Sequence, residues 1–157
     1  MSGVFRRTRV VSERDIDAIG HVNNAVWVRF IVELAEAAAH SRGFGADATR
    51  RLGGLWIVRR HEIDYLASAP LGVRLLEETW VSRMRGARSL RHARFSAEPG
   101  GAVFVEAVTQ WAFVDPETLR PRRIPRELLA GFAPSEGPGA QGPVSRSGGA
   151  CLPRSGR

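Results

Sequence analysis

The spacing of apolar residues predicts one long amphipathic helix over residues 25–42. Apolar side chains recur there at intervals of three and four residues, which places them on one face of a helix. The members of this stripe are Val26, Phe30, Ile31, Leu34, Ala35 and Ala38. Asn23 or Asn24 can cap the start of the helix, and Gly43 can end it in the left-handed conformation. A helix of this length needs a broad apolar surface on which to lie.

Alternation of apolar and polar residues predicts strands on both sides of this helix. The expected strands span residues 4–12, 55–65, 73–84, 89–98 and 102–115, and a short helix spans 125–130. Consecutive strands with short links pair antiparallel. We therefore expect an α+β domain in which an antiparallel sheet of about five strands wraps around one long central helix. The free edges of such a sheet favour a partner subunit.

Composition divides the chain into two parts. Residues 1–133 form the predicted domain, and residues 134–157 are rich in Gly, Pro, Ser and Arg, which favours a flexible tail. The single cysteine, Cys151, lies in this tail and can form neither an internal disulfide nor a cysteine-based metal site. The sequence contains no membrane-length apolar stretch and begins with no signal-peptide pattern, so we expect a cytoplasmic protein.

The formal net charge of +7 favours anionic partners. All 23 basic residues are arginine, and 20 of them fall within residues 1–133 beside 15 acidic residues. This excess can attract a phosphorylated small molecule such as coenzyme A, or it can be a solvated surface. Because the arginines are scattered and no recognition motif is present, we expect neither nucleic acid nor a membrane as a partner.

The chemistry-bearing residues concentrate just before the long helix. Residues 14–24 contain two acids, a glycine, a histidine and two adjacent amides. A helix start offers free N–H donors and the positive end of the helix dipole. A carboxylate fixed there can act as a base or nucleophile, while the amides polarise a carbonyl oxygen. The same residue types are common in turns and caps, so a purely structural role stays open.

This segment resembles the signature of the hotdog-fold thioesterases. The matching residues are Asp15, Asp17, Gly20, His21, Val22, Asn23 and Asn24, followed by Trp27. Residues 63–72 resemble the strand of that family that leads into a Pro/Ala turn, and the resemblance extends over about residues 5–130. It implies a hotdog fold that hydrolyses an acyl thioester at a site between the subunits of a homodimer or homotetramer. The absence of metal-ligand spacing or a phosphate-binding glycine loop predicts no metal and no cofactor.

The resemblance also implies roles for the loop residues. Asp17 matches the family's catalytic aspartate, which would attack the thioester carbonyl or activate a water molecule. His21 is the second catalytic candidate, either by orienting the loop or by moving a proton. The family presents a backbone N–H to the substrate oxygen in the segment that matches residues 19–24, without a firm choice among them, and Gly20, Asn23 and Asn24 of this segment are predicted to bind substrate.

A second substrate-binding region is expected at Arg88 and Ser89. They match the turn and strand start at which 4-hydroxybenzoyl-CoA thioesterase contacts the phosphates of coenzyme A, and arginine donates two hydrogen bonds to a phosphate. A solvated charged hairpin is the alternative that stays open for this turn. Five positions depart from the family patterns, and two of them, Gly86 and Ala87, replace basic residues of this turn. Ile19 and Leu66 replace the Asn and Glu of the plant acyl-ACP enzymes, and Val73 replaces an Asp after a glycine.

Three functions remain open on the sequence alone. The first is hydrolysis of acyl-CoA, and the second is release of an acyl or polyketide chain from an acyl carrier protein. The third is a hotdog domain that binds acyl groups without hydrolysing them. Retention of Asp17 favours a hydrolase, because a binding module needs no carboxylate at that position.

Overall fold

The computed structural model describes residues 3–138, and its elements lie close to the predicted positions. In chain order they are β1 (Phe5–Val10), the 3-10 helix η1 (Glu13–Asp15), α1 (Asn24–His40), α2 (Ala46–Arg51), β2 (Leu55–Tyr65), β3 (Arg74–Arg85), β4 (Arg88–Ala97), β5 (Val103–Val114) and α3 (Arg126–Gly131). The prediction of an α+β hotdog fold is confirmed. The sequence analysis missed η1 and α2, because three and six residues are too short to show a helical period.

The strands form one antiparallel sheet in the order β1-β3-β4-β5-β2. The expectation that consecutive strands pair holds for β3–β4 and β4–β5 but is wrong for β2 and β3. Instead β2 pairs with β5 along the far edge. The physical reason lies in the link of residues 66–73. It hydrogen-bonds to other loops, from Gly72 N–H to Val11 O (2.9 Å) and from Val22 N–H to Ala69 O (3.0 Å), and so carries the chain across to the other side of the sheet.

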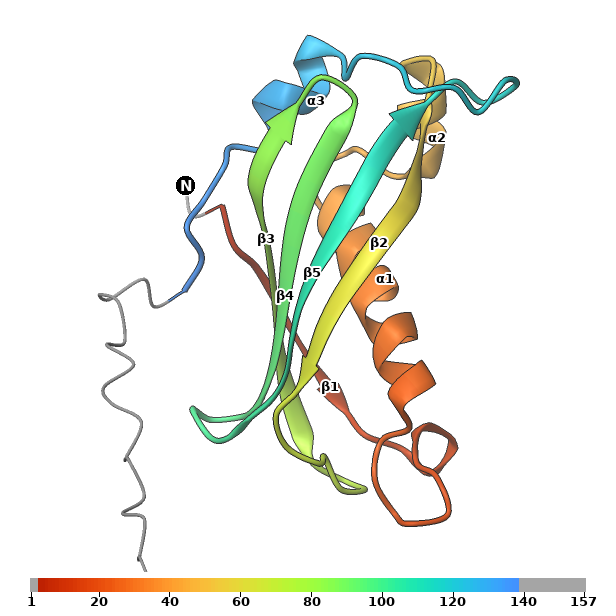
Figure 1. Ribbon diagram of the computed structural model, residues 1–157. Coiled ribbons are helices and arrows are strands. Elements are labelled where there is room, and N and C mark those ends of the chain that lie inside the picture. The colour runs from red at the N-terminus through yellow and green to blue at the C-terminus, as the bar shows by residue number, and fades with distance from the viewer. Residues whose placement is uncertain (1–2, 139–157) are drawn as a thin grey trace, which may run out of the picture.

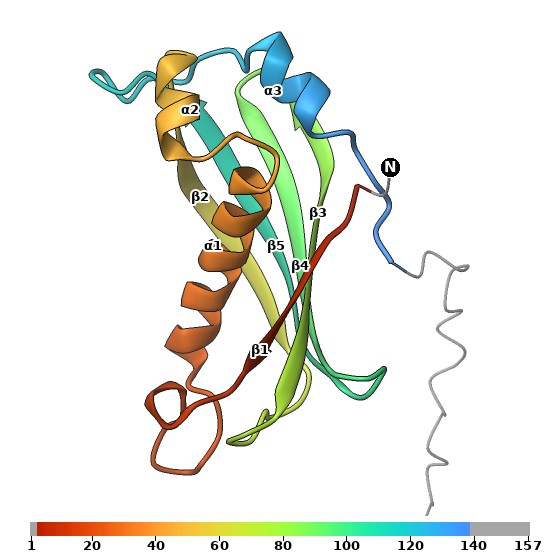
Figure 2. The ribbon, with the colours of Figure 1, turned by 180° about the vertical axis from the view of Figure 1, so that it is seen from behind.

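Helix α1 lies against the concave face of the twisted sheet, as Figures 1 and 2 show. Its buried residues are Trp27, Phe30, Ile31, Leu34, Ala35 and Ala38. This is the predicted stripe with one change, because Trp27 takes the buried place that was expected for Val26. The Trp27 ring packs edge-on against Phe30 and Phe95, with centroids 5.7 and 5.3 Å apart. The Asn23 side chain caps the helix by accepting a hydrogen bond from Ala25 N–H (2.8 Å).

A smaller apolar cluster closes the opposite end of the sheet beneath α3. Its buried members are Val81, Phe113, Ile124, Leu128 and Phe132. The N–H of Ser135 donates to Val81 O at 2.9 Å, so the chain still contacts β3 two residues beyond the predicted domain end. Residues 139–157 of the predicted tail, including Cys151, lie outside the described residues. Within residues 3–138 no helix has the length and apolar character needed to cross a membrane.

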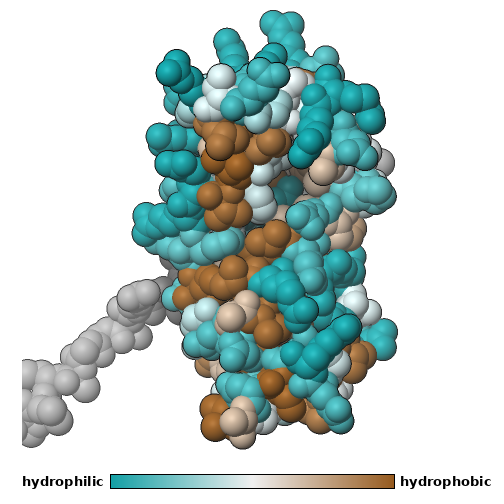
Figure 3. Space-filling model, turned by 90° about the vertical axis from the view of Figure 1, so that its right-hand side faces the viewer, coloured by the Kyte–Doolittle hydropathy of each residue, from teal (hydrophilic) through white to brown (hydrophobic). Residues whose placement is uncertain are grey.

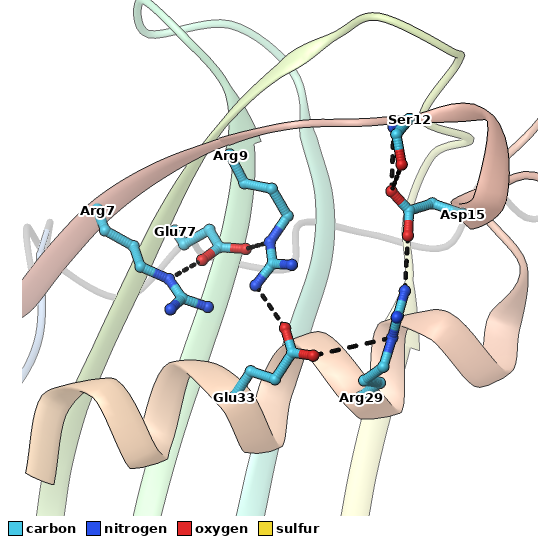
Figure 4. A network of polar contacts seen from close by, with 7 residues as sticks. All are labelled: Arg7, Arg9, Ser12, Asp15, Arg29, Glu33 and Glu77. Carbon is cyan, nitrogen blue, oxygen red and sulfur yellow. Dashed lines mark hydrogen bonds and ion pairs between the residues drawn. The ribbon is translucent and has the colours of Figure 1, made fainter. Parts of the chain in front are cut away.

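Strand β1 carries charge on the side that faces the helix. Its half-buried positions alternate with exposed ones, and two of them are Arg7 and Arg9. Both guanidinium groups donate through Nε to Glu77 of β3, a side chain with no exposed area, and the Arg9 bond measures 2.6 Å. Figure 4 shows this carboxylate held between the two arginines. An ion pair therefore takes the place that apolar packing usually has between a strand and the core.

Replacing Glu77 with Gln should lower the free energy of unfolding by about 3 kcal/mol. The amide keeps the shape of the side chain but leaves two half-buried guanidinium charges uncompensated, and breaking a buried ion pair typically costs this much. Urea unfolding followed by tryptophan fluorescence measures the loss. Glu62→Gln is the matched control, because the Arg60–Glu62 pair is about 60% exposed and its loss should cost less than about 1 kcal/mol. Equal losses in the two variants would contradict the role given to Glu77.

Candidate active site

The loop between β1 and α1 is anchored by Asp15, the first acid of the Asp-x-Asp motif. Asp15 is 4% exposed and accepts hydrogen bonds from Ser12 N–H (3.0 Å) and Ser12 Oγ–H (2.6 Å). Its other oxygen accepts from Arg29 Nη2 of α1 at 2.6 Å. Arg29 and Arg9 both reach Glu33, which joins this anchor to the Glu77 ion pairs (Figure 4). We call these six residues the arginine–carboxylate network: Arg7, Arg9, Asp15, Arg29, Glu33 and Glu77.

These contacts keep Asp15 ionised. Burial alone raises the pKa of a carboxyl group, but the hydrogen bonds from Ser12 and the Arg29 guanidinium outweigh it, and the pKa of Asp15 is lowered. A buried carboxylate with three donors around it has little freedom to react. Asp15 therefore has a structural role, in contrast to the second acid of the motif.

Asp17 is half-buried and much less engaged. Its carboxylate accepts one hydrogen bond, from Ile19 N–H at 3.0 Å, and no cation of residues 3–138 pairs with it. The backbone around it forms a narrow hairpin, closed by Asp17 N–H to His21 O (2.9 Å) and Gly20 N–H to Asp17 O (3.0 Å). Gly20 turns this hairpin at a φ of 80°, which favours glycine. The fold thus fixes the backbone of Asp17 and leaves its second carboxylate oxygen available.

The loop leaves two backbone donors free at the helix start. The N–H groups of Ile19, Gly20, Val22 and Asn23 all donate to protein oxygens. Those of His21 and Asn24 have no acceptor among the described residues. The ring of His21 makes no hydrogen bond within residues 3–138 either, so nothing there ties it to Asp17. The oxyanion donor was expected within residues 19–24. The N–H groups of His21 and Asn24 are the candidates that remain, because the other donors of this segment are occupied.

Exposed apolar side chains surround this loop. Residues 66–73 run beside it through the Val22–Ala69 hydrogen bond and a bridge between His21 and Pro70. Ile19, Leu66 and Leu71, which belong to these two segments, are 75%, 56% and 49% exposed. Apolar side chains in such numbers next to a free carboxylate are typical of a binding surface. The two motifs that were singled out in the sequence are therefore neighbours in space.

Arg88 and Ser89 lie at the other end of the molecule. They begin β4 at the turn beneath α3, whereas Asp17 precedes α1 at the opposite end (Figure 1). Strand β4 has ten residues and spans about 30 Å. Arg88 is exposed and Ser89 is 4% exposed. One chain therefore brings Asp17, Gly20, His21, Asn23 and Asn24 together but leaves Arg88 and Ser89 apart from them.

The sequence analysis missed a cavity at the end of α1 that is distant from Asp17. Its volume is about 790 Å³, and Ser89 is one of the residues that line it. Most of the wall comes from side chains that no local motif connects, including Phe44, Trp56, Trp111 and Phe132. Residues 3–138 contain no cluster of three or more His, Cys, Asp or Glu side chains that would hold a metal ion.

Comparison with known proteins finds a family model that matches most of the chain. Residues 11–132 match the family model described as the thioesterase-like superfamily. A curated relative, the acyl-CoA thioester hydrolase YbgC of Escherichia coli O6:H1, is 28% identical over 129 residues, which are 82% of this chain and 96% of that protein.

Two solved structures show the same fold. Slr0204, a 1,4-dihydroxy-2-naphthoyl-CoA thioesterase from Synechocystis, superposes with a TM-score of 0.75 at 18% identity over 82% of this chain and 95% of that one. A probable thioesterase from Bartonella henselae gives a TM-score of 0.71 at 24% identity over 78% and 99% of the two chains.

Asp15→Asn should loosen the loop and destabilise the protein near neutral pH. The amide cannot balance the charge of Arg29, and a hydrogen bond to a charged group is typically worth about 1.5–3 kcal/mol. Because the pKa of Asp15 is lowered in the folded state, its contribution is fully present above the ordinary carboxyl pKa of 3.8 and is lost as pH falls below it. Urea unfolding of both proteins at pH 7 and at about pH 3 tests this. If the difference in the free energy of unfolding between the two proteins does not become smaller at the lower pH, the ionised state of Asp15 is contradicted.

Proposed function

The chain belongs to the thioesterase-like superfamily, and we propose that it hydrolyses acyl-CoA thioesters with Asp17 as the catalytic carboxylate. The observation that carries the proposal is the contrast between the two acids of the loop. The carboxylate of Asp15 is occupied by hydrogen bonds from Ser12 and Arg29. Asp17 is half-buried, has no cation partner among the described residues and lies beside exposed apolar side chains. The similarity to the acyl-CoA thioester hydrolase YbgC supports coenzyme A as the leaving group.

The loop supplies the parts that thioester hydrolysis needs. Asp17 either attacks the thioester carbon itself or takes a proton from an attacking water molecule. Negative charge then develops on the carbonyl oxygen, and the free N–H groups of His21 and Asn24 are the donors available to stabilise it. The carbon–sulfur bond breaks, and the thiolate of coenzyme A leaves and takes up a proton. After direct attack, a water molecule hydrolyses the resulting anhydride, so both routes release the acid.

We infer that the complete site forms between two subunits. Asp17 and Arg88 lie at opposite ends of one chain, so one bound molecule reaches both only if the Asp17 end of one subunit meets the Arg88 end of another. A two-fold axis near the middle of α1 achieves this. The face that carries β2 and α1 is suited to such pairing, because β2 is an edge strand of 11 residues and apolar side chains gather on this face in Figure 3. A homodimer is the smallest assembly of this kind; a homotetramer of such dimers and the cytoplasmic location stay predictions.

Asp17→Asn should keep the fold and lower the hydrolysis rate by at least about 100-fold, the usual contribution of a general base or nucleophile. The measurement is release of free thiol from a panel of acyl-CoAs of different chain length and aromatic character. Asp47→Asn is the matched control, because Asp47 is an exposed acid on α2 outside the site, and its rate should not change.

Two outcomes of this panel would redirect the proposal. Normal turnover by Asp17→Asn would show that Asp17 only closes the hairpin. A wild-type protein that hydrolyses no acyl-CoA would favour an acyl carrier protein as the substrate, or binding without hydrolysis, and the same assay with acyl carrier protein thioesters separates these two.

Arg88→Ala should raise KM for acyl-CoA about 10-fold and leave kcat unchanged. Arg88 would contact a phosphate that lies far from the reacting carbon, so its contribution is equal in the ground state and the transition state. One charge-assisted contact on an exposed side chain is worth roughly 1.5 kcal/mol. A short acyl thioester without the nucleotide should be hydrolysed equally by both proteins. Equal impairment on both substrates would show that Arg88 supports the fold instead.

Mixing the two variants tests the site between subunits. If Asp17 and Arg88 come from different chains, a dimer of one Asp17→Asn chain and one Arg88→Ala chain contains one site with both changes and one wild-type site. Unfolding and refolding the two variants together should then restore activity at low acyl-CoA concentration, above the sum of the separate proteins. If light scattering shows dimers but the mixture has no more activity than the separate variants, Asp17 and Arg88 of one site come from the same chain.

A further inference from the structure

Beyond α3 the chain runs along the edge of β3 and onto the convex face of the sheet, the side away from α1. Successive side chains of a strand point to opposite faces. Glu77 of β3 meets Arg9 on the helix side, so Trp80, three positions further on, points to the convex face. The N–H of Ser135 donates to Val81 O at 2.9 Å, and Gly137 packs against the Trp80 ring with no room for a Cβ atom. The last described residues are therefore already seated on this face.

A groove of about 650 Å³ continues from this point across the sheet. Residues of β2, β3, β4 and β5 line it together with Pro138, and the Trp80 ring stacks there on His92 with a centroid distance of 5.2 Å. Four of the lining residues are acids, namely Glu62, Asp64, Glu106 and Glu136. The first three come from β2 and β5, and the fourth belongs to the segment that follows α3.

The groove has more acidic than basic groups. Arg94 of β4 lines the groove and pairs with Glu106 at 3.5 Å. Glu62 pairs with Arg60 at 2.9 Å, and both of these side chains are about 60% exposed. The other two acids of the groove pair with no cation of residues 3–138. On a protein with a formal net charge of +7, this face therefore has an excess of negative charge that favours a cationic occupant.

The sequence that follows Pro138 has the opposite charge. Residues 139–157 lie outside the described residues, and they include Arg146, Arg154 and Arg157 and no acid. Because Pro138 lines the groove, this sequence begins at the groove. The eight residues from Pro138 to Arg146 can span about 26 Å. The three strand spacings from β3 to β2 amount to about 14 Å, so every acid of the groove is within reach.

We propose that residues 139–157 bind along this groove of their own chain, with the three arginines paired to its acids. A single exposed ion pair is weak, but a tethered segment has an effective concentration in the millimolar range, so several weak pairs are sufficient. Such pairs need proximity and not one fixed conformation, so the composition that predicted a flexible tail does not oppose them. The bound segment covers Trp80 and keeps other chains away from this face of the sheet.

The proposal does not rest on the proposed hydrolysis. The groove lies on the convex face, whereas Asp17 precedes α1, which lies on the concave face. None of the residues that line the groove belongs to the candidate active site. The Asp17→Asn variant should therefore bind its own residues 139–157 as the wild type does.

The single cysteine allows a test in the full chain. A nitroxide attached to Cys151 broadens the NMR signals of nearby protons, and the four tryptophans give four indole N–H signals. Trp80 lies at the groove, whereas Trp27 is buried beneath α1 and Trp56 and Trp111 line the cavity at the end of that helix. We expect the Trp80 signal to be broadened more than the other three.

Removing charge from either partner should reverse this broadening. Replacing Arg146, Arg154 and Arg157 together with Gln should lower the ratio of bound to free segment about 10-fold, the combined size of three exposed ion pairs. Sodium chloride at about 1 M, which screens exposed charges, should have the same effect.

A groove variant and a control variant test the acids. The groove variant carries Glu62→Gln, Asp64→Asn and Glu106→Gln. The control variant changes the net charge equally at three exposed acids outside the groove, through Glu13→Gln, Asp47→Asn and Glu117→Gln. The groove variant should lose the broadening of Trp80, and the control variant should keep it.

Four results would overturn the proposal. Three of them are equal broadening of the four indole signals, unchanged broadening of Trp80 after the arginines are replaced, and equal losses in the groove and control variants. The fourth comes from a mixture of isotope-labelled chains without nitroxide and nitroxide-labelled chains without isotope. Broadening of Trp80 in that mixture would assign the contact to a second chain.

Discussion

Glu77 connects the first strand, the sheet and the helix of this domain. Its side chain has no exposed area and accepts from Arg7 and Arg9, and Arg9 continues to Glu33 on α1. The interaction is unusual because it buries charge where strand and core normally exchange apolar contacts. It is tolerable because each carboxylate of the arginine–carboxylate network meets at least one guanidinium. The network then ends at Asp15, so the same set of ion pairs that holds β1 also fixes the loop that carries Asp17.

Local periodicity was sufficient to predict the elements of this fold but not all of their neighbours. The α1 stripe and the alternation along β5 arise from residues close in sequence, and both could be read directly. The pairing of β2 with β5 depends on what residues 66–73 do, and they are held by Val11 and Val22, more than 40 positions earlier in the chain. No property of the link itself shows this. The inward-facing arginines of β1 posed a similar difficulty, since their partner Glu77 lies in another strand.

The sequence was sufficient to predict that the site residues cluster before α1, but the residue types alone do not show which of them have structural roles. The motif contains two acids two residues apart, and only the resemblance to the thioesterases singles out Asp17, because the residue types alone have the same chemistry. Burial and the ion pair with Arg29, 14 residues further on, make Asp15 structural and leave Asp17 free. The free N–H groups of His21 and Asn24 likewise emerge only when the other hydrogen bonds of the loop are assigned. The sequence predicts Arg88 at a turn before a strand, but it does not show that this turn lies at the opposite end of the molecule from Asp17.

The arginines near the two ends of α1 meet different partners, and the difference bears on function. Near the start of the helix Arg29 meets Asp15, and midway Arg9 meets Glu33 and Glu77, so positive charge is matched within the chain. Near its end Arg91 finds only a hydroxyl group and an aromatic ring. Arg42, which also packs against Phe132, pairs with no carboxylate of the described residues either, and it donates to carbonyl oxygens instead. In the proposed dimer this end of one chain meets the Asp17 end of the other, so positive charge without a carboxylate partner would stand where an anionic substrate binds.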